Sequence, residues 1–493
     1  MRISILATSD VHGYIQAADE LTGQTTPTGL SRVSTFVKDR RANGDTIVLV
    51  DNGDFLEGSA LATYLYMNQH RWMDHPLSAA MNALQYDAAV PGNHEFNYGL
   101  PYLERSVQQM AFPYLAANVV DQRTLAPLWQ PYTIIERSGV KIGIIGLITD
   151  YIPRWEHNDN VPGLAFLDPI QTAHQWAAEL RPQVDLLLLS YHGGTERDLT
   201  TGLPTEYQTG ENVAYRLASE ITGIDGIIAG HQHKVLSGFV GQVPVLQPGT
   251  RGSHVGELSF TVERDEKNRW IVVDRQVELI SMGDVPEDEE LLEQLEPWLK
   301  ESTDWLDTPT ESYLDRSIPE LLHTIQQTVT GEPISAISLF ETGGAEQSVT
   351  MKQLMKNYTF PCTFAVLRLS GKELKESLRK AANYFKITEV GRLTPYCKES
   401  MAGEPDDMWR GLTYSLVDGE VSQLEIDGRL IQEEDIVTFV CNHYKTIGEG
   451  IRIFPKHAVT NEIMIYVPDL VIGLAVNGQM TLPVQTHQYK TIH

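Results

Sequence analysis

The chain has 493 residues, with 38 Lys and Arg against 65 Asp and Glu and a formal net charge of −27 at pH 7. A field of this sign repels polyphosphate backbones, which argues against the binding of long DNA or RNA as a main task. The length exceeds that of a single hydrophobic core and predicts two domains.

Cysteine is scarce, and Cys362, Cys397 and Cys441 show no C-x-x-C spacing, which argues against a disulfide framework and a thiolate zinc site. The opening apolar run is too short for the core of a signal peptide, and no stretch approaches the length that spans a membrane. We therefore expect a cytoplasmic protein with no membrane partner.

The first half of the chain repeats a short apolar run followed by a loop rich in Gly, Asp, Asn or His. The runs have the length of buried strands and lie at 3–7, 47–50, 88–90, 186–189 and 227–229. Helical periodicity lies between several of them, as at 30–41 and 103–110, and further strands are expected at 141–147 and 256–262. This alternation predicts α/β layering around one mainly buried sheet.

The composition and the hydrophobic pattern change after residue 286. Residues 287–305 are acidic with apolar positions at helical spacing, which predicts either a connecting helix or the last helix of the first domain. A helix at 317–328, a strand at 363–369 and a helix at 372–384 predict a second α/β domain. We therefore divide the chain into a domain at 1–284, a connecting helix at 285–309 and a second domain at 310–493.

Polar clusters follow each of the five predicted strands of the first half. They are Asp10-Val11-His12, Gly53-Asp54, Gly92-Asn93-His94-Glu95, His192 and Gly230-His231-Gln232-His233. Ligands gather at the carboxyl edge of the strands in open α/β sheets, so these loops can converge. Each cluster alone is weak, because an isolated histidine at a strand end is more often structural, but the ordered set of five favours a metal site.

The residue types suit two cations held close together. Asp54 is the natural bridge, because a carboxylate can give one oxygen to each ion. Asp10, His12 and His233 can hold the first ion. Imidazole and carboxylate ligands without thiolate suit Mn, Zn, Fe, Co or Ni.

The second ion would be held by Asn93, His192 and His231, where the neutral amide adds no charge that would repel phosphate. Such a pair of ions can bind a phosphoryl group and activate water. His94 follows Asn93 and would point the other way, where its imidazole could stabilise phosphoryl oxygens or give a proton to the leaving alkoxide. Packing within the loop is the alternative for His94, and Glu95 could orient a histidine or cap a helix.

These motifs resemble the calcineurin-like metallophosphoesterases. More narrowly, the chain resembles the two-domain 5′-nucleotidase family through Gly92-Asn-His-Glu-Phe-Asn-Tyr-Gly99, Leu369-Ser-Gly-Lys-Glu-Leu374 and Asn442-His-Tyr-Lys445. The resemblance implies a four-layer β-sandwich flanked by helices that holds the metals, followed by an α/β domain that selects the nucleotide.

Asn97 points to one branch of the family. The 5′-nucleotidases usually have Asp at this position, where it pairs with the catalytic histidine, whereas this loop looks more like the 2′,3′-cyclic-nucleotide 2′-phosphodiesterase/3′-nucleotidases. Residues 249–256, which include His254, and residues 382–385 also resemble that branch. An amide at position 97 leaves His94 without an anionic partner in this motif.

The resemblance also implies residues that contact the substrate. Tyr444 matches one of two aromatic rings that enclose the base, with Asn442 in the same motif, and His254 lies in the segment similar to the branch. Asp406 stands where the other ring is expected, with Trp409 nearby as a substitute, and Glu346 follows the paired glycines where an Arg is common. Core packing is the alternative for Tyr444 and Trp409.

The leading hypothesis is metal-dependent hydrolysis of small nucleotide phosphoesters, of the 2′,3′-cyclic-nucleotide 2′-phosphodiesterase/3′-nucleotidase type. The alternatives are a 5′-nucleotidase or nucleotide-sugar hydrolase, and a nucleotide-binding protein without activity. A protein phosphatase is disfavoured, because a second domain indicates selection of a small molecule.

Overall fold

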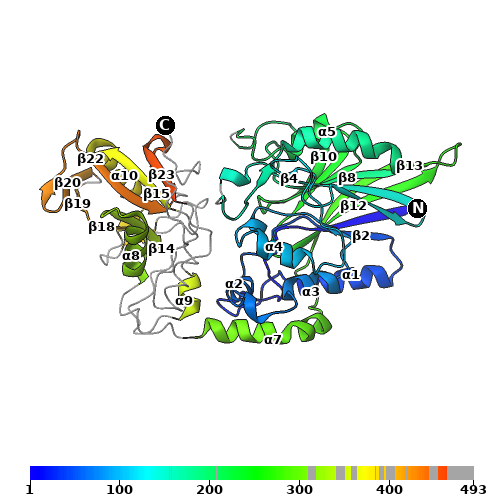
Figure 1. Ribbon diagram of the computed structural model, residues 1–493, viewed down its shortest axis with the longest axis horizontal. Helices are drawn as coiled ribbons and strands as arrows, with labels where there is room; N and C mark the ends of the chain where they lie inside the picture. The colour runs from blue at the N-terminus through cyan, green and yellow to red at the C-terminus, as the bar shows by residue number, and fades with distance from the viewer. Residues whose placement is uncertain are drawn as a thin grey trace. The chain divides into compact units, whose positions relative to one another are not determined.

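The computed structural model describes residues 1–154, 156, 158–206, 208–308, 318–339, 350–356, 364–382, 385–387, 393–395, 406–417, 420–442 and 454–463. The chain divides into two compact units, Met1–Thr303 and Asp304–His493. Figure 1 labels many of their helices and strands. Each unit has its own sheets and its own hydrophobic core.

Two mixed sheets form the centre of the first unit. The five-stranded sheet has the order β13-β12-β1-β2-β3, and the six-stranded sheet has the order β10-β11-β9-β8-β6-β5. The strands of the first sheet are β1 (Arg2–Thr8), β2 (Ile47–Asp51), β3 (Ala88–Ala89), β12 (His254–Arg264) and β13 (Trp270–Ser281). Those of the second are β5 (Tyr132–Arg137), β6 (Val140–Ile148), β8 (Leu186–His192), β9 (Gly226–Ala229), β10 (Val235–Val240) and β11 (Val243–Pro248). A separate pair consists of β4 (Val119–Asp121) and β7 (Leu164–Phe166).

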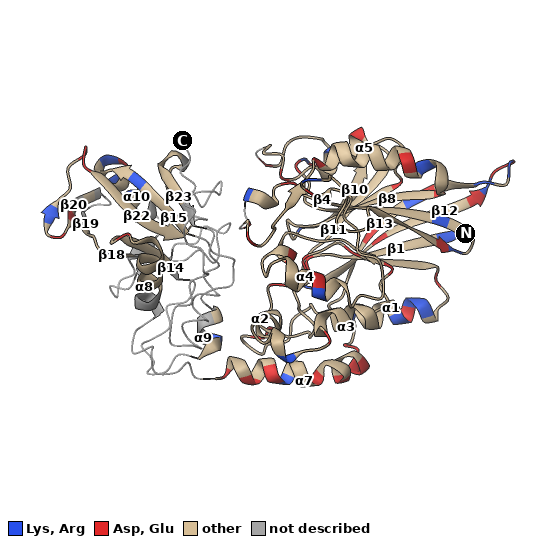
Figure 2. Ribbon diagram, viewed as in Figure 1, with Lys and Arg blue, Asp and Glu red and all other residues tan. Residues whose placement is uncertain are grey.

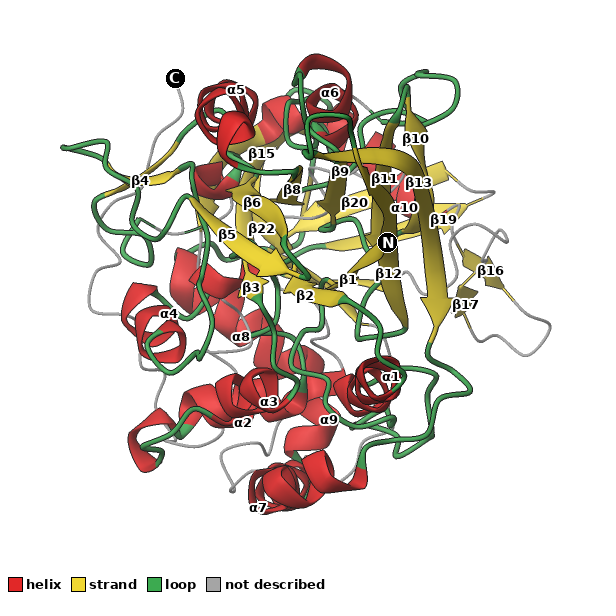
Figure 3. Ribbon diagram, turned by 90° about the vertical axis from the view of Figure 1, so that its right-hand side faces the viewer, coloured by secondary structure: helices red, strands yellow, loops and turns green. Residues whose placement is uncertain are grey.

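The two sheets pack face to face. Their facing side chains form one buried cluster that includes Ile5 and Val50 from the first sheet and Ile144 and Leu188 from the second. Helices cover both outer faces, so that the strands lie between two helical layers in Figure 3. The helices of this unit are α1 (Leu30–Ala42), α2 (Ala60–Met67), α3 (Pro76–Ala83), α4 (Leu100–Val107), α5 (Pro169–Leu180), α6 (Ala214–Glu220) and α7 (Glu289–Leu306). The predicted four-layer sandwich is confirmed.

The expectation of one central sheet was wrong. The predicted strands are present, but β1, β2 and β3 belong to one sheet whereas β8 and β9 belong to the other. Every position of β8 is buried, because one of its faces packs on the opposite sheet and the other on α5 and α6. A continuous apolar run reports burial on two sides, and it does not distinguish one covered sheet from two stacked sheets.

Helix α7 lies close to the predicted segment 287–305. Asp288 accepts a hydrogen bond from the Leu291 amide, which marks the beginning of the helix. The helix is rich in acidic residues (Figure 2). It is anchored to the first unit, because Glu301 accepts a hydrogen bond from Tyr64 at 2.7 Å and Trp298 packs against the ring of Trp72. These contacts favour the last helix of the first domain over a free connecting helix. Helix α4 begins three residues before the predicted start, after Gly99 with Pro101 in its first turn.

The second unit is built on the sheet β18-β14-β22-β15-β23. Its helices are α8 (Ile318–Thr330), α9 (Met351–Lys356) and α10 (Gly371–Ala382), and its strands are β14 (Ser335–Leu339), β15 (Phe364–Ser370), β16 (Phe385–Ile387), β17 (Leu393–Pro395), β18 (Asp406–Arg410), β19 (Thr413–Val417), β20 (Glu420–Ile426), β21 (Arg429–Leu430), β22 (Ile436–Asn442) and β23 (Val459–Ile463). Ser370 and Glu373 exchange hydrogen bonds with each other's backbone amides at the beginning of α10, which is the pattern of a capping box. Among the described residues, none of the helices is both long and apolar enough to cross a membrane.

One buried ion pair attaches α1 to the first sheet. The carboxylate of Glu257 on β12 is bound by both terminal nitrogens of Arg40 at 2.8 and 3.0 Å and by the hydroxyl of Ser4 at 2.7 Å. Burial raises the pKa of Glu257, but the hydrogen bonds from Arg40, Ser4 and Ser259 together have a larger, opposite effect. The resulting pKa is about 2. Stability from this group is therefore present above its ordinary pKa of about 4.5 and is lost as the pH falls from 4.5 toward 2.

We expect Glu257→Gln to lower the free energy of unfolding at pH 7 by about 3 kcal/mol, because it removes the buried carboxylate that both terminal nitrogens of Arg40 bind and leaves that guanidinium with the exposed carboxylate of Asp45. Urea unfolding of metal-free protein should show that the difference from wild type narrows as the pH drops below about 4.5. Glu263→Gln, at an exposed position of the same strand, is the control and should change stability by less than about 0.5 kcal/mol. A difference between wild type and Glu257→Gln that does not depend on pH would contradict this account.

Candidate metal centre

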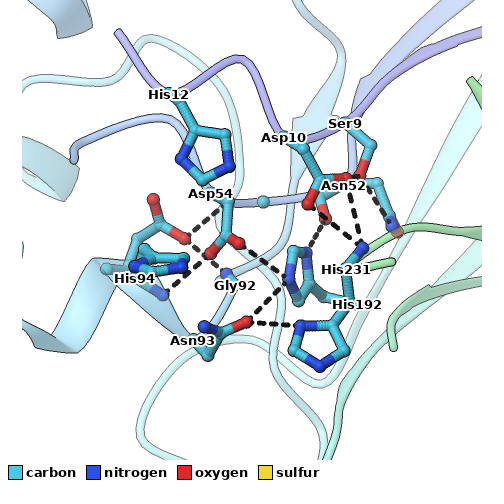
Figure 4. A network of polar contacts seen from close by, with 12 residues as sticks. Ser9, Asp10, His12, Asn52, Asp54, Gly92, Asn93, His94, His192 and His231 are labelled. Atoms are coloured by element: carbon cyan, nitrogen blue, oxygen red, sulfur yellow. Dashed lines mark hydrogen bonds and ion pairs between the residues drawn. The ribbon is translucent and has the colours of Figure 1, made fainter. Parts of the chain in front are cut away.

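The five polar loops of the first unit converge on one place. Figure 4 shows the side chains of Asp54, Asn93, His192 and His231 pointing toward one another, with Asp10 and His12 beside them. The loops that follow β1, β2 and β3 leave one sheet and those that follow β8 and β9 leave the other, so the site lies where the ends of two sheets meet.

Asp10, His12 and His233 form the first group of potential metal ligands. One ligand atom from each lies within 4.8 Å of the others. The Nε2 atoms of His12 and His233 are 3.0 Å apart, and His233 Nε2 lies 3.4 Å from Asp10 Oδ1. These three residues are the set expected to hold the first ion.

Asp54, His192 and His231 form the second group, again with ligand atoms within 4.8 Å of one another. The amide oxygen of Asn93 joins them, 2.8 Å from His231 Nδ1 and 3.2 Å from His192 Nε2. Carboxylate, amide and imidazole atoms of both groups therefore face a common centre, in the arrangement that the sequence predicted for two cations.

The site fits a cation on evidence independent of the motif. Asp54 is 1% exposed, and its Oδ1 accepts a hydrogen bond from the His94 amide at 2.8 Å. Its Oδ2 lies 3.2 Å from His192 Nε2 but forms no hydrogen bond within the described part of the chain. A buried carboxylate oxygen without a hydrogen bond is costly, and a divalent ion at this point would satisfy it.

Backbone conformation adds a second sign of functional constraint. Five of the seven expected ligands have positive φ angles: Asp10, His12, Asp54, His231 and His233, at 54° to 69°. This conformation disfavours residues with a Cβ and persists where the surrounding structure enforces it. The loops also approach closely, since a Cβ on Gly92 would lie 2.1 Å from Asp54 Oδ1.

Each of three histidines is held by a partner on its other ring nitrogen. His12 Nδ1 lies 2.8 Å from the carbonyl oxygen of Glu57, and His192 Nδ1 lies 2.6 Å from that of Asn52. His231 Nε2 lies 3.0 Å from the carboxylate of Glu211. Partners of this kind set the tautomer, so that the opposite nitrogen presents its lone pair to a metal.

The charges of the carboxylates also suit cations. Burial raises the pKa of Asp54, but His192 and His94 lower it more, and the result lies well below the ordinary value. Burial likewise raises the pKa of Asp10, and the contacts with His233 and His192 bring it below the ordinary value. Both groups are therefore anionic at neutral pH.

His94 has an anionic partner, contrary to the expectation based on Asn97. Its Nδ1 lies 3.0 Å from Glu57 Oε2 and 2.7 Å from Asn97 Oδ1. Burial lowers the pKa of His94, but Asp54 and Glu57 raise it further, well above the ordinary value. The sequence argument failed because it considered only the position three residues away, whereas Glu57 reaches His94 from the loop after β2.

The residues expected to bind substrate belong partly to the first unit and partly to the second. His254 begins β12, where its Nδ1 lies 3.1 Å from Ser253 Oγ. In the second unit, Trp409 packs against Phe439 with ring centroids 5.1 Å apart, and buried Asn442 accepts from Gln326 at 3.1 Å. Their positions favour the packing alternative for Trp409 and a structural role for Asn442. Tyr444, Glu346 and the side chain of Asp406 lie outside the described residues.

Sequence reasoning missed several residues that support the site. Fully buried Glu95, for which the sequence suggested a role in orienting a histidine or capping a helix, instead accepts hydrogen bonds from the backbone amides of Asp54, Phe55 and Leu56 at 2.7 to 3.1 Å. Glu57, Glu156 and Glu211 lie outside the motifs. The adjacency of Glu95 to His94 was a usable signal, whereas the other three become neighbours of the site only after folding.

Comparison with known proteins gives two family matches. Residues 3–235 match the calcineurin-like phosphoesterases, and residues 301–456 match the 5′-nucleotidase C-terminal domain. The first match contains all seven residues of the two ligand groups.

Several relatives match most of the chain, across the two regions just named. A 2′,3′-cyclic-nucleotide 2′-phosphodiesterase/3′-nucleotidase of Yersinia enterocolitica is 28% identical over 86% of this chain and 73% of its own length. One of the same name from Salmonella typhimurium is 27% identical over 86% of this chain and 74% of its own. A Staphylococcus aureus protein assigned as a 5′-nucleotidase, solved in complex with α-ketoglutarate, is 29% identical with a TM-score of 0.74 and 98% of both chains covered. The chain therefore belongs to the 5′-nucleotidase family of calcineurin-like metallophosphoesterases.

Proposed function

We propose that this protein hydrolyses phosphoesters of nucleotides at a centre of two divalent metal ions, as a 2′,3′-cyclic-nucleotide 2′-phosphodiesterase/3′-nucleotidase. The observation that carries the proposal is the convergence of two ligand groups next to the buried Asp54 oxygen, which forms no hydrogen bond within the described part of the chain. The names of the relatives from Yersinia enterocolitica and Salmonella typhimurium support the substrate class.

The chain's own residues divide the work of binding the ions. Asp10, His12 and His233 would hold one ion, with Asp54 shared between the two. Asn93, His192 and His231 would hold the other. When bound, such ions neutralise charge on the phosphoryl oxygens and lower the pKa of a bound water.

His94 is the residue placed to act on the leaving group. Contacts to Glu57 and Asn97 occupy its Nδ1, which leaves Nε2 as the nitrogen that can reach a substrate. The raised pKa, caused by Asp54 and Glu57 against the effect of burial, keeps the ring charged at neutral pH. A charged imidazole can give a proton to the departing alkoxide.

A second candidate is a 5′-nucleotidase, because the Staphylococcus aureus structure assigned to that activity covers 98% of the chain. Asn97 favours the first candidate, since the usual Asp of the 5′-nucleotidase motif is replaced. The cytoplasmic location stays a prediction.

The substrate class is tested by product analysis on 2′,3′-cyclic AMP, 3′-AMP and 5′-AMP, with metal-stripped protein to which Mn²⁺ is returned. We expect metal-dependent conversion of the cyclic ester to 3′-AMP and then to adenosine. Turnover of 5′-AMP alone would support the second candidate, and the absence of turnover with every nucleotide would reject both.

Asp54→Asn should reduce turnover by roughly 100-fold or more and lower the metal content, because the neutral amide cannot offset the charge of two ions. Metal analysis of the purified protein and steady-state kinetics measure the two effects. Asp51→Asn is a matched control, since burial raises the pKa of Asp51 to about 8 and the side chain is already neutral at pH 7. Equal metal content in wild type and Asp54→Asn would reject the shared-ligand role.

His94→Gln should lower kcat/KM for the preferred nucleotide by about 100-fold. Turnover of 4-nitrophenyl phosphate should fall much less, because 4-nitrophenolate leaves without a proton. The metal content, measured on the same samples, should match wild type. Equal losses for the two substrates would show that His94 does not act on the leaving group.

A further inference from the structure

Asn97 lies between His94 and Glu156. Its Oδ1 is 2.7 Å from His94 Nδ1, and its Nδ2 donates to Glu156 Oε2 at 2.7 Å. An amide presents an acceptor at one end and two donors at the other. The contact with Glu156 therefore determines which end of Asn97 faces the histidine.

Glu156 is itself held in place. The residue is 8% exposed, and its second oxygen, Oε1, accepts from Asn160 Nδ2 at 2.7 Å. Asn160 also binds the loop of the catalytic motif, because its Nδ2 lies 3.1 Å from the Asn97 carbonyl oxygen and its own carbonyl accepts from the Leu100 amide at 3.0 Å. A carboxylate only accepts hydrogen bonds, so a flipped Asn97 would set two oxygens against each other.

The orientation of Asn97 matters for His94. With the amide oxygen facing the ring, Nδ1 must be the donor, and it is directed at Asn97 and Glu57. A flipped amide would place an N–H against this N–H, and the repulsion would turn the ring. A turned ring would remove Nε2 from its place at the substrate.

We propose that Glu156 is a positioning residue for the hydrolysis, which acts through Asn97 to fix the ring of His94. The inference rests on the proposed function, because it takes His94 to act on the leaving group. The hydrogen bond to the Asn97 amide connects Glu156 with the ring of His94, and Asn160 connects it with the backbone of the same loop.

The polarity of this chain of contacts can be reversed by two substitutions. Asn97→Asp alone sets two carboxylates against each other, and Glu156→Gln alone lets either end of both amides face the other. The double variant Asn97→Asp/Glu156→Gln keeps the total charge and restores a donor and an acceptor to the contact between the two side chains. The carboxylate introduced at position 97 would accept from both His94 and the amide of residue 156, whose oxygen would accept from Asn160.

The experiment compares kcat/KM for the preferred nucleotide with that for 4-nitrophenyl phosphate in metal-loaded protein. Glu156→Gln should lower nucleotide turnover by about 10-fold and aryl phosphate turnover much less. The double variant should return nucleotide turnover to within about threefold of wild type. Glu206→Gln is the control, because Glu206 also accepts from two side-chain amides, Gln232 at 2.7 Å and Asn212 at 2.8 Å, without contacting Asn97.

Two results would overturn the inference. Glu156→Gln could lower the turnover of both substrates equally, as Glu206→Gln is expected to do. Alternatively, the losses of the two single variants could simply multiply in the double variant.

His94→Gln distinguishes a failure of the proposed function from a failure of this inference. If His94→Gln shows no preference for the aryl substrate, the proposed role of His94 fails; if it does and Glu156→Gln does not, only the role of Glu156 fails. Thermal unfolding of each variant shows whether the protein is folded, and the double variant tests the inference even if one single variant is unstable.

Discussion

The metal centre depends on the hydrogen bonds that the carboxylate of Glu95 accepts. This carboxylate is fully buried and accepts hydrogen bonds from the amides of Asp54, Phe55 and Leu56, so it ties the loop after β2 to the loop after β3. Burial and the nearby Asp54 carboxylate raise the pKa of Glu95, while the backbone amides lower it, and the net result is a pKa of about 7. A side chain outside the expected ligand set thereby helps to set the distance between two of the expected ligands.

This attachment explains how the site tolerates its backbone. Positive φ at residues with a Cβ costs on the order of 1–3 kcal/mol each, and the ligand loops contain five such residues. The cost is offset by hydrogen bonds that continue outward from the ligands, as at His192, which binds the Asn52 carbonyl. Asn52, which follows β2 in the first sheet, in turn accepts at 2.7 Å from Ser190 on β8, the strand of the second sheet that ends at His192. Ligand geometry is thus coupled to the pairing of loops from both sheets.

The sequence predicts the first layer of the site and little beyond it. Asp54 and Asn93 could be identified because each lies in the loop that begins at the end of a buried strand, and the strand end limits where that loop can lie. Glu57 and Glu156 could not, because their contacts depend on how separate loops fold over the strand ends. The sheet assignment failed for a similar reason, since the apolar runs at β1 and β8 report burial without reporting the partner strand. Trp409 shows the opposite error, in which a nearby ring suggested a ligand contact while its neighbours Phe439 and Phe454 belong to the core.

The environment of His94 shows that charge belongs to a site and not to a position in a motif. An amide at position 97 removes one negative charge from the motif, yet Glu57 contacts the ring directly and Glu156 binds the far end of the amide. The histidine therefore keeps its positive character while the carboxylate of Glu156 is held one residue further away. The Coulomb energy between a carboxylate and the ring falls as the distance between them grows. The nearer Glu57 therefore has the larger effect on the charge of His94, whereas Glu156 can still orient the ring through its hydrogen bond to Asn97. Glu57 supplies the charge beside the ring, and Glu156 supplies the direction of the amide that holds it.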